Sequence, residues 1–223
     1  MGDSKVDSKV DSEMEETVGI EVTDDELAAA VEELNGSSRI KRQKASHLLM
    51  QLSDSEVERL LPYADDIADG LLHEEPQTRW EVLHALTRMG RAGQTYGDDV
   101  LAAAEDALYD ETSGTVREAA FQFICGYGAA SPGNSDEVWP LIDEALHCYH
   151  GDPEYSKMLT HLVAFAQGDV SMEALEAVAQ RMKFDSRTAH GTLRMRSEQV
   201  VEAYFARGGE FEEEPEEESE EEE

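Results

Sequence analysis

Apolar residues recur at helical spacing through the middle of the chain, and the pattern itself repeats. Pro76 begins a predicted helix, because a proline in the first turn sacrifices no hydrogen bond. One stripe of this helix carries Thr78, Val82, Leu83 and Leu86. The same stripe returns 38 residues later as Val116, Ala120, Phe121 and Ile124. One such helix cannot bury its stripe alone, so we expect the copies to stack on one another.

Less regular copies flank these two. The upstream copy carries Ile40, Ala45 and Leu48, with Lys44 interrupting the stripe, and the downstream copy carries Tyr155, Leu159, Thr160 and Val163. A further helix precedes each of these, and Leu61-Pro62 aligns with Trp139-Pro140 two periods later. Helix pairs with a period near 40 residues are typical of an α-solenoid, so the predicted fold is all-α with about five pairs.

Capping and turn residues predict where the helices begin and end. Thr23 and Glu26 form a capping box before the first apolar stripe. Ser53 or Ser55 is the predicted N-cap of the next first helix, and Gly90 is the predicted end of the helix that Pro76 begins. Residues 126–135 are rich in glycine, serine and proline, which indicates a loop.

The turn and second helix of the repeat resemble the HEAT-repeat family. The resemblance rests on residues 77–80, Gln-Thr-Arg-Trp, and residues 115–120, Thr-Val-Arg-Glu-Ala-Ala, and it extends over roughly residues 24–207. It implies a curved stack whose second helices line a concave surface that holds partners. It implies no particular activity.

Composition separates the chain into three parts. Residues 1–22 contain a polar repeat of Asp-Ser-Lys-Val and are predicted to be disordered. Residues 23–208 are predicted to form the repeat domain, and residues 209–223 a disordered glutamate tail. No run of about 18 apolar residues and no secretory signal occurs in the sequence. Cys125 and Cys148 fall in helical patterns rather than in a disulfide framework, so we expect a reducing cytoplasm.

Net charge restricts the partners. The chain carries −33, from 51 acidic against 18 basic residues, and residues 210–223 contribute 11 glutamates. Nucleic acids and anionic membranes are bound through basic groups, so neither is an expected partner. A basic protein is the partner that this charge favours. A second interpretation is that the acidity reflects a high-salt cytoplasm, in which case the protein would lose structure in dilute buffer.

The candidate catalytic and metal-binding groups are weak. His147 and His150 lie three residues apart on a helix, but no second ligand pair with zinc spacing follows. His73-Glu74 is similar to the pairs of HEAT-like di-iron hydroxylases, which need several such pairs. Trp80 and Trp139 invite comparison with HEAT-like DNA glycosylases, which bind DNA in a basic groove. We therefore expect no catalytic residue, no metal and no cofactor.

Three columns of the second helices carry the remaining candidates. Arg79 and Arg117, with Lys41 in the same column, are expected to pair with acids of neighbouring turns such as Glu75 or Asp110. The columns two and six residues after Thr78 project away from the stripe and form a predicted partner-binding ridge of Arg42, Trp80, His84, Glu118, Gln122, Lys157 and His161. An ordinary solvated face is the competing interpretation.

The sequence therefore favours a non-enzymatic scaffold that binds a basic protein on the concave face of a HEAT-like solenoid. The alternative is an enzyme on the same fold, either a lyase or a metal-dependent hydroxylase.

Overall fold

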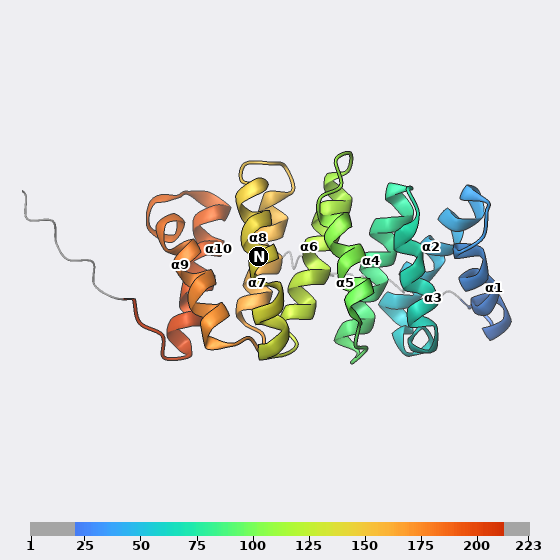
Figure 1. The fold of residues 1–223 in the computed structure, drawn as a ribbon, viewed down its shortest axis with the longest axis horizontal. Helices are drawn as coiled ribbons and strands as arrows, with labels where there is room; N and C mark the ends of the chain where they lie inside the picture. The colour runs from blue at the N-terminus through green and yellow to red at the C-terminus, as the bar shows by residue number, and fades with distance from the viewer. Residues whose placement is uncertain (1–20, 212–223) are drawn as a thin grey trace, which may run out of the picture.

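The computed structural model describes residues 21–211, and over this range every regular element is a helix. The helices form five antiparallel pairs stacked along one axis (Figure 1). The first members are α1 Asp24–Leu34, α3 Ala64–Ala68 with the 3-10 turns η1 Val57–Arg59, η2 Leu61–Tyr63 and η3 Asp69–Leu72, α5 Asp98–Leu108, α7 Pro132–Cys148 and α9 Met172–Thr188. The second members are α2 Arg39–Ser55, α4 Pro76–Arg91, α6 Gly114–Gly128, α8 Tyr155–Ala166 and α10 Gly191–Ala206. The predicted all-α solenoid of five helix pairs is confirmed.

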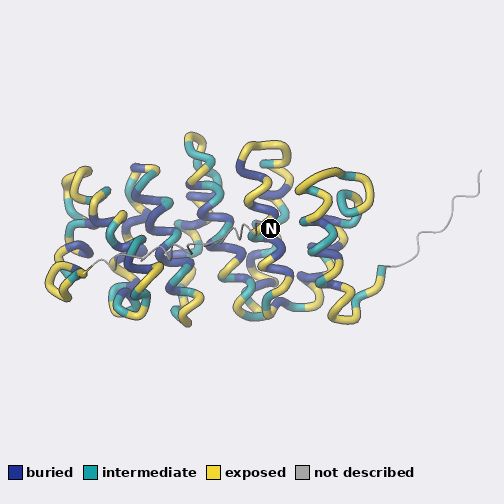
Figure 2. The backbone as a smooth tube through the Cα atoms, turned by 180° about the vertical axis from the view of Figure 1, so that it is seen from behind, coloured by how far each residue is buried: buried dark blue, intermediate teal, exposed yellow. Residues whose placement is uncertain are grey.

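The core runs lengthwise through the stack, between the two rows of helices (Figure 2). Each second helix packs on the second helix of the next pair, from α2 to α10, whereas contacts between first helices are sparser. The stripes predicted for α4 and α6 are buried throughout: Thr78, Val82, Leu83 and Leu86, then Val116, Ala120, Phe121 and Ile124. Burying these side chains against neighbouring layers is what stabilises helices that could not fold alone.

The register of the two flanking copies differs from the prediction. In α2, Ile40 is 68% exposed, while Ser46 and Leu49 are buried beside Ala45. The stripe of α2 therefore precedes that of α4 by 37 residues, and Lys44 does not interrupt it. In α8, Leu159 and Val163 are buried as predicted, but Thr160 is exposed and Leu162 is buried instead.

Several helix boundaries also differ. The helix α4 passes through Gly90, and Gly93 takes the positive φ of 99° that follows its end. Ser53 and Ser55 belong to α2 rather than capping the next element. The predicted loop at residues 126–135 is mostly helical, because α7 begins at Pro132 with the hydroxyl of Ser131 accepting a hydrogen bond from the Asn134 amide at 3.2 Å.

The first helix of the second pair is short and broken. Gly70 explains how closely it approaches its neighbours, since a Cβ there would lie 2.9 Å from Val82 Cγ2 and 3.1 Å from Leu34 Cδ2. Five apolar side chains of this segment are nevertheless buried: Leu60, Ala64, Ile67, Ala68 and Leu71.

The domain extends slightly past its predicted limits. The Val22 carbonyl accepts a hydrogen bond from Arg59 at 2.8 Å. At the other end, the Phe211 ring lies 5.4 Å from Tyr204 and 5.3 Å from Phe205. The disorder predicted for residues 1–20 and 212–223 falls outside the described residues. Among residues 21–211, no helix is both long and apolar enough to cross a bilayer.

Candidate functional site

Three arginines join successive layers through ion pairs. Arg42 of α2 pairs with Glu75, Arg79 of α4 pairs with Asp110, and Arg117 of α6 pairs with Glu154. The Arg79 Nη1–Asp110 Oδ2 distance is 2.7 Å, and Arg117 Nε donates to Glu154 Oε1 at 2.6 Å. All six side chains are largely buried. The predicted pairing of Arg79 and Arg117 with acidic residues of neighbouring turns is confirmed, and Arg79 Nη2 also pairs with Asp106 at 2.8 Å.

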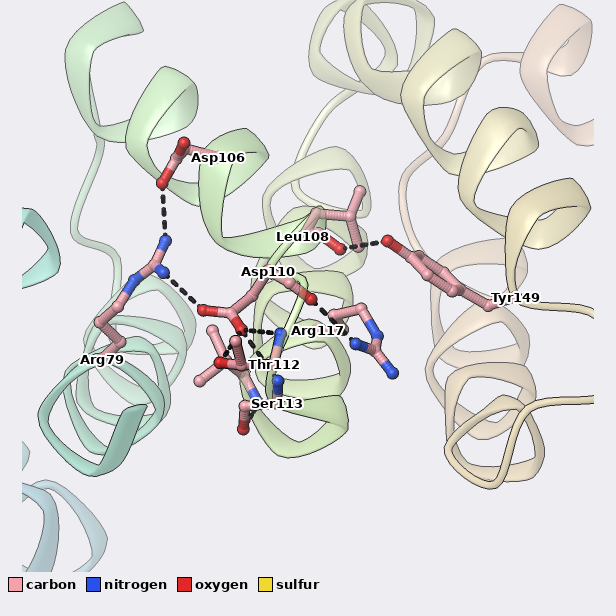
Figure 3. A network of polar contacts seen from close by, with 9 residues as sticks. Arg79, Asp106, Leu108, Asp110, Thr112, Ser113, Arg117 and Tyr149 are labelled. Carbon is pink, nitrogen blue, oxygen red and sulfur yellow. Dashed lines mark hydrogen bonds and ion pairs between the residues drawn. The ribbon is translucent and has the colours of Figure 1, made fainter. Parts of the chain in front are cut away.

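Asp110 is the centre of this network (Figure 3). Its carboxylate accepts hydrogen bonds from the amides of Thr112 at 2.9 Å and Ser113 at 2.8 Å, and its carbonyl accepts one from Arg117 Nη1 at 2.8 Å. Burial raises the pKa of Asp110, but these hydrogen bonds and the charge of Arg79 outweigh it, so the pKa lies below its usual range. Asp110 thus holds the turn that connects α5 to α6.

The predicted register of α2 is wrong by one residue, so Arg42 does not belong to the ridge. Its guanidinium occupies the same column as Arg79 and Arg117, where Nη1 donates to the Gly36 carbonyl at 2.8 Å and Nη2 pairs with Glu75. Lys41, which was placed in that column, instead pairs with Glu33 at 2.6 Å near the surface. The apolar Ile40 suggested the wrong start for the α2 stripe.

The corrected register brings His47 onto the face that carries His84. His47 Nδ1 lies 3.0 Å from Glu81 Oε1, and Ser46 Oγ donates to Glu81 Oε2 at 2.6 Å. Glu81 is only 1% exposed, so these partners compensate for the burial of its charge. Sequence reasoning missed this group because it depends on the α2 register.

Trp80 and His84 lie on the same face of α4 with different surroundings. Trp80 is half-buried and packs against the core, which corrects the expectation that it projects away from it. His84 Nε2 lies 3.0 Å from Asp54 Oδ1, and Arg88 Nε pairs with the same oxygen at 2.8 Å.

Three predicted ridge residues come together between α6 and α8. Glu118 accepts from Lys157 Nζ at 3.3 Å, and His161 Nε2 lies 3.0 Å from its other oxygen. The His161 contact, and then Lys157, hold the pKa of Glu118 below its usual value. Asp54, Glu81 and Glu118 on this face therefore each have a basic neighbour.

A cavity of about 480 Å³ opens between the C-terminal halves of α4 and α6. Gln122 and His161 line it, which links it to the predicted ridge. Its other lining residues are Leu86, Thr87, Gly90, Arg91, Gln94, Thr95, Tyr96, Phe123, Cys125, Gly126, Tyr127, Ala129, Ala130, Asn134 and Ala164. None of these is an aspartate or glutamate, although the chain contains 51 of them.

The acidic residues are concentrated on one row of helices. The first-helix segments, residues 24–34, 57–72, 98–108, 132–148 and 172–188, contain 20 acidic and four basic residues, counting lysine and arginine. The five second helices contain five acidic and 11 basic residues. The chain thus presents an acidic row of first helices and a row of second helices with a small positive balance.

The two histidines considered as metal ligands lie on the surface. His147 and His150 are both exposed, and the His150 ring lies 5.1 Å from that of Tyr155. Within residues 21–211, no three histidine, cysteine or acidic side chains are grouped closely enough to bind a metal ion.

Comparison with known proteins supports the fold. Neither a family model nor a curated protein sequence matches the chain. An engineered protein of 12% identity superposes with a TM-score of 0.63, covering 85% of this chain and 83% of that one. A structure of computationally designed armadillo repeat proteins for modular peptide recognition gives 0.62 at 13% identity, covering 81% of this chain and 82% of that one.

A third similar structure contains a ligand. It is a designed armadillo repeat protein in complex with the peptide (KR)4, with 15% identity, a TM-score of 0.53, and coverage of 80% of this chain and 99% of that one. At these identities the likeness establishes the fold alone. The chain has a HEAT- and armadillo-like repeat fold.

Proposed function

We propose that this chain is a non-enzymatic scaffold that binds an extended segment of a protein partner along its second helices. The observation that carries the proposal is the contrast between the two rows. The first helices are strongly acidic, whereas the second helices present paired charges, histidines and a cavity without carboxylates. A continuous face of different chemistry from the remaining surface is what a recognition site requires.

The repeat architecture supports an extended ligand. Each layer adds one second helix to the same face, so a partner segment lying across the layers meets similar positions in turn. Two of the similar solved structures are armadillo designs, one described for modular peptide recognition and the other bound to the peptide (KR)4. These are properties of those proteins, and they make a peptide-like segment the natural ligand class to test here.

The charge of the chain adds a kinetic role. We propose that the partner is a basic protein and that the scaffold acts in the cytoplasm. The acidic first helices and the glutamates of residues 212–223 would attract such a partner from a distance, which speeds association. The second helices would then retain an uncharged part of it, since basic side chains already outnumber acidic ones there.

A selection experiment with matched variants tests the proposal. Random peptides displayed on phage would be selected against the immobilised full chain, and the affinities of the enriched peptides would be measured by calorimetry. Gln122→Arg places a long side chain on the second-helix face, and Ala102→Arg places the same group on the exposed side of α5. We expect Gln122→Arg to weaken binding about tenfold or more and Ala102→Arg to leave it unchanged. The reverse order, or no enriched peptide, would contradict the proposal.

A further inference from the structure

We infer that the cavity between α4 and α6 is a pocket for an uncharged aromatic side chain of the bound partner segment. The inference rests on the proposed function and specifies what the second-helix face recognises. Three kinds of observation carry it: the glycines that open the cavity, the side chains that line it, and the charges that are missing from it.

Gly126 leaves space rather than allowing close packing. It lies within α6 and is exposed, and a Cβ there would meet only Thr87 Cγ2, at 3.9 Å. Gly128, two residues further along α6, is different, because its Cβ would lie 2.6 Å from both Phe165 and Val138. Glycine inside a helix costs about 1 kcal/mol relative to alanine, and packing does not require that cost at position 126. What the absent side chain provides is access to the cavity.

Gly90 opens the opposite wall in the same way. It lies in α4, and its Cβ would meet only the Tyr96 ring, at 3.4 Å. Two glycines on facing helices allow a flat ring to approach the backbone closely. The position 38 residues before Gly126 is Arg88 in α4, and the register that aligns Glu118 with Lys157 places Phe165 of α8 at the equivalent position, so neither neighbouring layer has a glycine there.

Aromatic residues form the interior of the cavity. The Tyr96 and Phe123 rings meet edge to face with centroids 5.2 Å apart, and Tyr127 also lines the space. The hydroxyl of Tyr96 donates to the Leu86 carbonyl, which fixes that ring in place. A guest ring would gain aromatic contacts beyond the burial of its area, and about 480 Å³ accommodates the largest side chains.

The charges around the cavity disfavour an ionised guest side chain. The cavity is lined by no carboxylate, and Arg91 at its edge is the one lysine or arginine among its lining residues. A lysine or arginine guest would be desolvated without an acidic partner among the lining residues. Arg91 is exposed, so its attraction for an acidic guest would be worth little. An uncharged aromatic residue is the guest that remains.

Single amino-acid amides test the pocket without a known partner. Titration of the ¹⁵N-labelled full chain with N-acetyl-tryptophanamide, followed by NMR, should shift the signals of Gly90, Gly126 and the Gln122 side-chain amide saturably at millimolar concentration. N-acetyl-lysinamide should not shift them. Gly126→Leu fills the opening and should weaken the tryptophanamide affinity about tenfold or more.

Gly133→Leu is the matched control. A Cβ at Gly133, near the start of α7, would meet nothing within 4 Å, and this residue does not line the cavity. Both variants replace a helical glycine with leucine, so both should fold at least as stably as the parent, as urea denaturation would verify. Equal affinity in the two variants, no saturable shift, or equal binding of lysinamide would overturn the inference.

The same variants separate this inference from the proposed function. Peptides that bind the second-helix face and are indifferent to Gly126→Leu would overturn the pocket and leave the scaffold intact. Tryptophanamide binding without any peptide binding would instead contradict both the scaffold and the idea that the pocket serves a partner segment.

Discussion

Arg79 and Asp110 meet between α4 and the turn that follows α5, with Nη1 2.7 Å from Oδ2 and both side chains about nine-tenths buried. Asp110 also binds the backbone of that turn. The pair therefore connects the layer of α4 to the next layer, and Asp110 also fixes the turn between α5 and α6. Buried pairs of this kind make the stack specific, because removing either partner leaves an uncompensated charge.

Arg79→Met should lower the free energy of unfolding by about 3 kcal/mol, because Asp110 would remain buried without its cation. Urea denaturation at neutral pH measures this. Lys41→Met is the control: its pair with Glu33 is exposed, so the loss should stay below about 1 kcal/mol. Equal losses in the two variants would show that burial does not govern these ion pairs.

Glu118 should contribute acid-sensitive stability. Its folded pKa is lowered by His161 and then Lys157, so its contribution is complete above the unfolded value of about 4.3 and is lost as pH falls through the folded value. Glu118→Gln should be less stable than the parent at pH 7 and should lose less stability between pH 5 and pH 3. Urea midpoints across this range test the prediction, and parallel pH profiles for the two proteins would contradict it.

Leu86→Ala should cost about 2–5 kcal/mol, since Leu86 is fully buried between layers. Leu72→Ala, at a leucine that is 75% exposed, should change stability by less than about 0.5 kcal/mol. Hydrogen exchange should show loosening of α2, α4 and α6 in the Leu86 variant, because each layer contacts only its neighbours. Uniform loosening from α1 to α10 would argue against a stack of semi-independent layers.

Trp80→Ala should lower the free energy of unfolding by about 2 kcal/mol. It should also weaken the binding of any partner. The indole is half-buried against the core, so it contributes to folding, although less than a fully buried tryptophan. Thermal and urea unfolding measure the stability term. No measurable loss would show that the ring is free to serve recognition alone.

The fold could be predicted from the sequence because the stripes of α4 and α6 are apolar and 38 residues apart. The register of α2 could not, since Ile40 offers an apolar position that the structure leaves in solvent. The prediction of a loop at residues 126–135 is wrong for a related reason. Gly126 and Gly128 lie inside α6, where the first leaves space and the second allows close packing.

The candidate site was only partly predictable. The meeting of Glu118 with Lys157 and His161 follows from the repeat, because equivalent positions in adjacent layers face each other. The cavity does not follow from it, since Tyr96 enters from a loop outside the periodic pattern. The separation of charge between the two rows is present in the sequence and becomes visible once the helices are assigned to rows.

Hydrogen exchange of the full chain, measured with and without a peptide selected against it, tests the central claim most directly. The proposal predicts slower exchange in α4, α6 and α8 and no change in α5 and α7. Protection confined to the first helices, or to residues outside 21–211, would contradict binding along the second helices.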